Sequence, residues 1–106
     1  MSALIWCPFP DRSAAREVAN ALLDEKLIAC ANLLPDVESI FEWGGARESG
    51  KEIGVLFKTD AALLDRAAGR LAALHPYDTP AIMGWKCDAA STATQAWLGS
   101  LRERED

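Results

Sequence analysis

The sequence has 106 residues, of which half are hydrophobic and a quarter charged, as in a single globular domain with a modest core. Its formal net charge of −5 argues against a protein that neutralises many nucleic-acid phosphates or binds anionic lipid. We therefore expect one domain over residues 1–106, with no nucleic-acid partner and no membrane association.

The N-terminal apolar run, residues 3–7, ends at Pro8 without a basic leader. It is too short for a signal peptide or a membrane span, so we expect a cytosolic protein. The three cysteines, Cys7, Cys30 and Cys87, are an odd number without CxxC spacing, which fits reduced thiols. For Cys30 and Cys87 we predict small, buried apolar side chains.

The first half of the chain predicts a strand, a helix and a second strand. Residues 4–7 form a short strand that ends at Pro8, and Asp11 caps a helix that runs to about Glu25, because apolar residues recur there at helical spacing. Residues 27–34 form the second strand. After Pro35-Asp36 a two-residue alternation resumes and reaches Trp43, so this strand should contain a kink or bulge.

The second half repeats the alternation of strand and helix. Gly44-Gly45 and the polar residues 47–51 predict a hairpin connection, followed by a third strand over residues 53–58. Thr59 or Asp60 caps a second helix that ends near residue 74. Residues 81–87 form a fourth strand, and Ser91 caps a last helix in which we place Trp97 in the core.

This order of elements predicts an α+β protein, a ferredoxin-like βαββαβ sandwich with a long β-hairpin and an extra C-terminal helix. The first strand should lie beside the fourth, with the second and third paired. Strand directions then bring Cys7, His75 and Trp43 to one end of the sheet. Because one sheet face and two edge strands are left uncovered, we also expect a closed homo-oligomer.

The segment from His75 to Pro80 contains the only histidine of the chain. Its two prolines disfavour helical geometry in the residues before them, so the second helix should end near His75. Chain direction therefore places a thiol and the only imidazole near one another. The alternative interpretation is that the prolines simply stop a helix and His75 is a polar surface residue.

The chain resembles the CutA family of divalent-cation tolerance proteins. The resemblance extends over nearly the whole sequence and rests on Pro10-Asp11, residues 27–32, Phe41-x-Trp43-x-Gly45, Glu52 with the strand to Lys58-Thr59, residues 75–80 and Trp97-Leu98. It implies a ferredoxin-like subunit in a trimer, similar in architecture to PII signalling proteins. It further implies divalent metal binding, notably of copper, with ligands at Cys7 and His75 and no established reaction.

The ligands that the sequence offers predict a metal site of low affinity. A thiolate and an imidazole suit copper or zinc, but two ligands are too few, so Asp78, water or a neighbouring subunit would have to complete the set. The negative end of the helix also favours imidazolium, which must lose its proton before it binds metal. Leu74 stands where family members can have a second histidine. We predict weak, pH-dependent binding of copper or another divalent metal.

Other functions remain as alternatives. A PII-like signalling trimer could bind a small anion between subunits beside Lys58 or Arg47, although the sequence has no glycine-rich phosphate loop. Nothing predicts an enzyme or an organic cofactor, because one histidine without a nucleophile or carboxylate partner is no catalytic pattern. Candidate ligand or subunit-interface residues are Trp43, Lys58, Tyr77 and Asp78.

Overall fold

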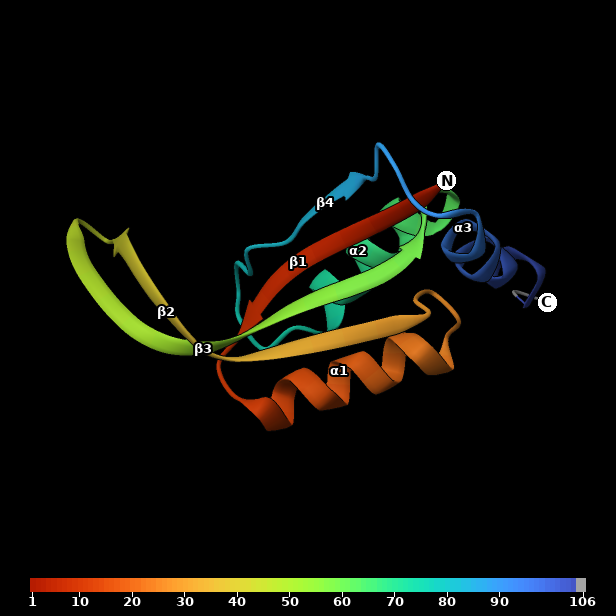
Figure 1. Ribbon diagram of the computed structural model, residues 1–106. Helices are drawn as coiled ribbons and strands as arrows, with labels where there is room; N and C mark the ends of the chain where they lie inside the picture. Colours follow the sequence, from red (N-terminus) through yellow and green to blue (C-terminus); the bar gives the residue numbers. More distant parts are fainter. Residues whose placement is uncertain (105–106) are drawn as a thin grey trace.

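The computed structural model describes residues 1–104 and contains the predicted order of elements. These are β1 (Ser2–Phe9), α1 (Arg12–Asp24), β2 (Cys30–Trp43), β3 (Ala46–Asp60), α2 (Leu64–Leu74), β4 (Met83–Lys86) and α3 (Thr92–Gly99), with 3₁₀ turns at Ala61–Leu63 and Ser100–Arg104. The strands form one antiparallel sheet in the order β2-β3-β1-β4, which is the pairing that the sequence predicted. Helices α1 and α2 lie on one face of this sheet, and the β2–β3 hairpin projects beyond its end (Figure 1).

Strand β1 is central and its side chains alternate between two environments. Ala3, Ile5, Cys7 and Phe9 are fully buried, whereas the residues between them are half-buried. Because successive side chains of a strand point to opposite faces, the buried set faces the helices and the half-buried set lies on the uncovered face. The hydrophobic core therefore lies between the sheet and the two helices.

Helix α1 begins and ends where its sequence dictates. The Asp11 carboxylate accepts a hydrogen bond from the Ala14 N–H at 2.8 Å, which caps the first turn as predicted. Its buried residues recur every three or four positions and pack on the sheet: Ala15, Val18, Ala19 and Leu22. At the far end Glu25 forms an ion pair with Arg70 of α2 at 2.8 Å. This pair links the C-terminal end of α1 to the second half of α2.

The hairpin is tighter than the sequence predicted. Gly44 and Gly45 have φ angles of 61° and 82°, and together they form a two-residue turn. The polar stretch over residues 47–51 therefore belongs to β3 instead of the connection. The predicted bulge is present, since Pro35 and Asp36 together oppose the single residue Ile53. It bends the hairpin away from the body of the sheet (Figure 1).

Three further expectations need correction. Trp97 is 44% exposed instead of filling the core, because Leu98 and Leu101 supply the buried contacts of this segment. Cys30 and Cys87 are free and only half-buried, since both lie at the outer edges of the sheet. Thr59 is no helix cap: its hydroxyl donates to the Leu27 carbonyl, and Asp60 caps the 3₁₀ turn.

Within residues 1–104 no helix has the length and apolarity needed to cross a membrane.

Candidate functional site

His75 ends helix α2 and enters the core at the end of β1. Its backbone is extended (φ −68°, ψ 141°), as expected for a residue before proline. The side chain is only 7% exposed. The imidazole stacks on the Phe9 ring, with centroids 4.3 Å apart, and its other neighbour is the Tyr77 ring at 4.8 Å. The histidine is therefore no surface residue, which was the alternative interpretation of this segment.

Both ring nitrogens of His75 have hydrogen-bond partners. Nδ1 accepts from the Tyr77 backbone N–H at 3.1 Å, and Nε2 lies 2.9 Å from the Pro8 carbonyl oxygen. A backbone N–H can only donate, so in the neutral ring Nδ1 holds the lone pair and Nε2 carries the proton. Nε2 consequently donates to Pro8. One neutral tautomer satisfies the whole arrangement.

Cys7 lies beside this imidazole and uses the same acceptor. Its thiol is fully buried, and Sγ lies 3.6 Å from the Pro8 carbonyl oxygen. Thiol and imidazole thus converge on one backbone oxygen, at the common end of the sheet where strand direction had placed them. Burial, together with the negative charge of Glu52, raises the pKa of Cys7 to about 12. Cys7 is therefore a protonated thiol at physiological pH.

The donor set of one chain does not fit a formed metal site. A metal needs a thiolate and a free imidazole lone pair, but Cys7 holds its proton and His75 uses both nitrogens in hydrogen bonds. No group of three or more His, Cys, Asp or Glu side chains within residues 1–104 is arranged to hold a metal ion. The observed geometry instead fixes the loop after α2 to the end of β1.

Tyr77 extends this arrangement to the hairpin. Its hydroxyl donates to Glu52 Oε2 at 2.9 Å. Burial and the hydrogen bond to Glu52 raise the pKa of Tyr77 to about 12, so the phenol stays protonated. The sequence analysis assigned Glu52 no function at the site. Its position in a strand of alternating residues does not indicate a hydrogen-bond partner 25 residues away. We call Cys7, Pro8, His75, Tyr77 and Glu52 the His75 corner.

A groove of about 670 Å³ opens between the His75 corner and the hairpin. It brings together three of the predicted candidates, Trp43, Tyr77 and Asp78. Its accessible lining is mainly apolar, with Phe41 and Trp43 on the hairpin side and Lys51 as the basic side chain. Trp43 is 66% exposed, so the groove has an aromatic wall that the single chain leaves uncovered.

The two basic candidates for an anion lie elsewhere. Lys58 is on the uncovered sheet face, in one row with Cys30 and Leu4. Arg47 forms an ion pair with Glu42 near the hairpin tip. Neither lines the groove at the His75 corner. The single chain therefore does not assemble these two residues into one anion site.

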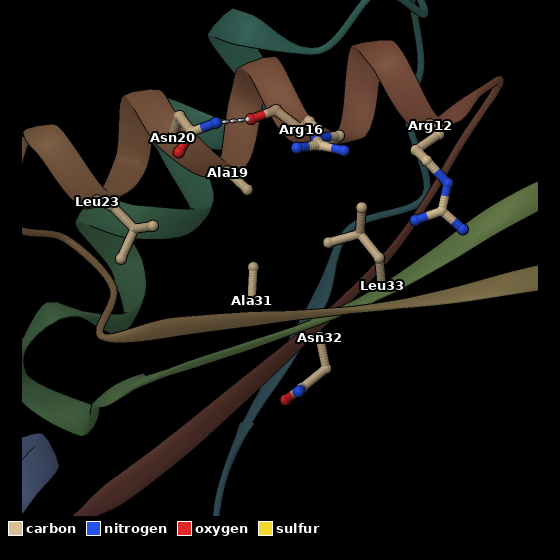
Figure 2. Close-up of a pocket in the computed structure, with 8 residues that line it drawn as sticks. All are labelled: Arg12, Arg16, Ala19, Asn20, Leu23, Ala31, Asn32 and Leu33. Carbon is tan, nitrogen blue, oxygen red and sulfur yellow. Dashed lines mark hydrogen bonds between the residues drawn. The ribbon is translucent and has the colours of Figure 1, made fainter.

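A second groove, of about 400 Å³, lies between α1 and β2, and Asn32 of β2 is one of its lining residues although its side chain points away from α1 (Figure 2). Arg12 and Arg16 of α1 extend over Leu33 of β2, and Ala19 faces Ala31 (Figure 2). No ion pair within residues 1–104 involves either arginine. This groove was not predicted, because two arginines one helical turn apart usually mark only a solvated helix face.

The fold defines a small α+β protein with a four-stranded antiparallel sheet, covered on one face by helices. Residues 3–100 match the model of the CutA1 divalent ion tolerance protein family. The chain belongs to this family, and a general role in divalent ion tolerance follows from that membership.

Individual relatives agree with this assignment. A divalent-cation tolerance protein CutA of Thermococcus kodakarensis is 36% identical over 98 residues, which cover 92% of this chain and 93% of the relative. The chloroplastic protein CutA of Arabidopsis thaliana is 33% identical, but the chain spans only 53% of its length. The crystal structure of CutA from Xylella fastidiosa superimposes with a TM-score of 0.90 at 32% identity, covering 94% of this chain and 96% of that one.

Proposed function

We propose that this protein serves divalent ion tolerance as a self-assembled, non-catalytic homotrimer of ferredoxin-like subunits in the cytosol. The observation that carries the proposal is the incomplete sheet. Strands β2 and β4 each have one neighbour within residues 1–104, so each leaves a row of backbone hydrogen-bonding groups without a strand partner. The face opposite the helices carries Leu34, Met83 and Trp85, which are 40%, 59% and 45% exposed.

Two different edges favour a cyclic assembly. If the β2 edge of one copy joins the β4 edge of the next, the interface is head-to-tail, and such an interface forms a ring where the rotation between successive copies closes. The strands at the two edges run in opposite directions, so this junction continues the antiparallel pattern of the sheet. A ring of three is the number that the family resemblance implies.

Copper binding at Cys7 and His75 stays a prediction. The geometry of the two side chains indicates which interactions a metal ion would have to replace. A metal at His75 has to displace either the Tyr77 N–H or the Pro8 carbonyl from the ring, and the Cys7 thiol has to lose a proton. Both requirements weaken binding near neutral pH. Within the proposal the His75 corner is therefore first a structural junction between β1, α2 and the hairpin.

Light scattering during size-exclusion chromatography tests the assembly. We expect a species three times the 11.5 kDa subunit mass, which persists on dilution. Trp85→Asp, a charge on the uncovered face, should dissociate it, whereas Asp65→Asn on the outer surface of α2 should not. A protein that elutes as a monomer at high concentration would contradict the proposal.

Copper titration tests the metal prediction separately. By calorimetry we expect weak binding that strengthens as pH rises, and that is reduced in both Cys7→Ser and His75→Ala. Cys30→Ser is the matched control for loss of a thiol. Binding unchanged in both variants would remove Cys7 and His75 from the site.

For the cellular role, a strain that lacks this protein should grow less well at elevated divalent metal and recover with the wild-type chain.

A further inference from the structure

The chain contains the spacing Arg-x-x-x-Arg twice, and the two arginine pairs have different environments. On α2, Arg70 donates to both oxygens of the Glu25 carboxylate, at 2.8 and 3.1 Å, and Arg66 has an interaction partner as well. On α1, Arg12 and Arg16 are exposed and form no ion pair within residues 1–104. Of two pairs with the same spacing, the one on α1 is therefore left without a partner in the described chain.

Unpaired guanidiniums at this spacing favour an anion. Residues one helical turn apart have their Cβ atoms about 5–6 Å apart, so Arg12 and Arg16 repel each other but can both reach one ligand. The carboxylate next to them in sequence, Asp11, instead accepts a hydrogen bond from the Ala14 N–H at the helix cap. A guanidinium can donate two parallel hydrogen bonds to a phosphate group. Two guanidiniums also match the charge of a phosphate dianion.

The groove beneath the two arginines offers an apolar surface in addition to charge. Its volume of about 400 Å³ lies within the range of about 300–1,000 Å³ that is typical of small-molecule sites. Ala19 of α1 faces Ala31 of β2, and both arginines extend over Leu33 (Figure 2). Inorganic phosphate would use the guanidiniums alone. A ligand that also covers these three apolar side chains needs an apolar body beside its anionic group.

We propose that the groove between α1 and β2 binds a small phosphate monoester, with its phosphate at Arg12 and Arg16 and an apolar or aromatic body along Ala19 and Ala31. A phosphate monoester carries a charge of about −1.5 to −2 near pH 7, which two guanidiniums can neutralise. The net charge of −5 opposes the approach of an anion, so the two arginines have to supply the attraction locally. This binding function goes beyond divalent ion tolerance and does not depend on the number of subunits.

An NMR titration of the isotopically labelled protein with phenyl phosphate tests the site. We expect the backbone amide signals of residues 12–23 and 31–33 to shift. Phenyl phosphate should bind at least about tenfold more tightly than inorganic phosphate, because its ring removes apolar surface of the groove from water. Phenol, which has the ring without the charge, should bind more weakly than phenyl phosphate. Added salt should weaken binding, since the arginines are exposed.

A matched pair of double variants tests the two arginines. Arg12→Ala/Arg16→Ala should weaken phenyl phosphate binding by at least about tenfold, because it removes both charge-assisted contacts. The control is Arg66→Ala/Arg70→Ala, which removes an arginine pair of the same spacing and charge from α2 and should leave the affinity within about twofold of wild type at physiological salt. Circular dichroism checks that both variants fold, and Arg12→Gln/Arg16→Gln replaces the first variant if it does not.

The possible outcomes separate the parts of the inference. Signal shifts confined to another region, or equal affinity of the two double variants, would overturn the site. Equal affinity of the wild-type protein for phenyl phosphate and inorganic phosphate would overturn the apolar contact and indicate an adventitious ion only. Absence of any shift at about 10 mM phenyl phosphate, which would reveal even millimolar affinity, would overturn the whole inference. None of these results bears on the trimer, which light scattering tests separately.

Discussion

The two faces of the sheet differ in how far a single chain completes them. On the helix-covered face Ile5, Cys7 and Phe9 have no exposed surface, and the thiol and imidazole at its end have hydrogen-bond partners. On the uncovered face Leu4 and Trp6 are half-buried, and Trp85 is 45% exposed. The first face is finished by the chain itself. The second face and the edges of β2 and β4 present apolar side chains and backbone groups that the rest of residues 1–104 does not cover.

Under the proposed assembly, folding and association would depend on separate residues of the same strand. Adjacent positions of β1 belong to different faces, because a strand alternates its side chains. Substitutions on the covered face should therefore act on folding, and those on the uncovered face on association. The predictions below test this separation.

The largest effect is expected for a matched pair on β1. Ile5→Ala should lower the free energy of unfolding by about 2–5 kcal/mol, because it leaves a cavity in the core. Leu4→Ala should cost the dissociated subunit only about 1 kcal/mol, because its side chain is already half in solvent. Urea unfolding at several protein concentrations measures both. Equal losses would mean that the two faces are equally buried in the folded subunit.

The next effect concerns close packing on the uncovered face. A Cβ added at Gly54 would lie 2.2 Å from Cη2 of Trp6 and 2.9 Å from Cγ2 of Val37. Gly54→Ala should therefore displace the indole and destabilise the protein by about 1–3 kcal/mol. Gly50→Ala is the control, since its added Cβ meets nothing within 4 Å. A change in tryptophan fluorescence should accompany the first variant, and an unaltered, equally stable Gly54→Ala protein would contradict the close contact.

A smaller effect is expected at the bulge that directs the hairpin. Asp36 has a φ angle of 58°, in the left-handed region that β-branched residues avoid. Asp36→Val should cost about 1 kcal/mol, whereas Glu38→Val, at an exposed position of the same strand, should stay within about 0.5 kcal/mol of wild type. Thermal unfolding compares the two. If both variants behave alike, the bulge does not constrain residue 36.

The smallest effect is the pH dependence of stability that arises at the His75 corner. It is negligible near neutral pH and increases in alkaline solution. Folding raises the pKa of Cys7 from 9.0, and that of Tyr77 from 10.0, to about 12. The folded state therefore favours the protonated forms, whose contribution to stability is complete below pH 9 and is lost as pH rises toward 12. Denaturant unfolding between pH 8 and about 12 should show this decline. Cys7→Ser and Tyr77→Phe should each reduce the decline of the free energy of unfolding with pH, and Cys30→Ser is the control. A decline that is unchanged in both variants would contradict the raised pKa values of Cys7 and Tyr77.

The sequence by itself determined the order of the elements and their pairing. Alternation of apolar residues, the Asp11 and Ser91 caps and the prolines at 8, 35 and 76 are local signals, and local signals place strands, helices and the bulge. The rule for right-handed crossovers then arranged the sheet, and strand direction brought Cys7 and His75 to one end. These inferences succeeded because each depends on neighbours in the chain or on handedness alone.

Only the tertiary structure decided what those two side chains do. The acceptor that Cys7 and His75 share is a backbone oxygen 67 residues from His75, and the partner of Tyr77 is a carboxylate on another strand. No spacing in the sequence encodes such contacts, because they arise where distant segments pack. Burial also raises the pKa of Cys7 to about 12, so the thiol predicted as a metal ligand is protonated near neutral pH in the single chain. Tertiary packing also decides that Leu98 and Leu101 are buried in the core, whereas Trp97 stays largely exposed.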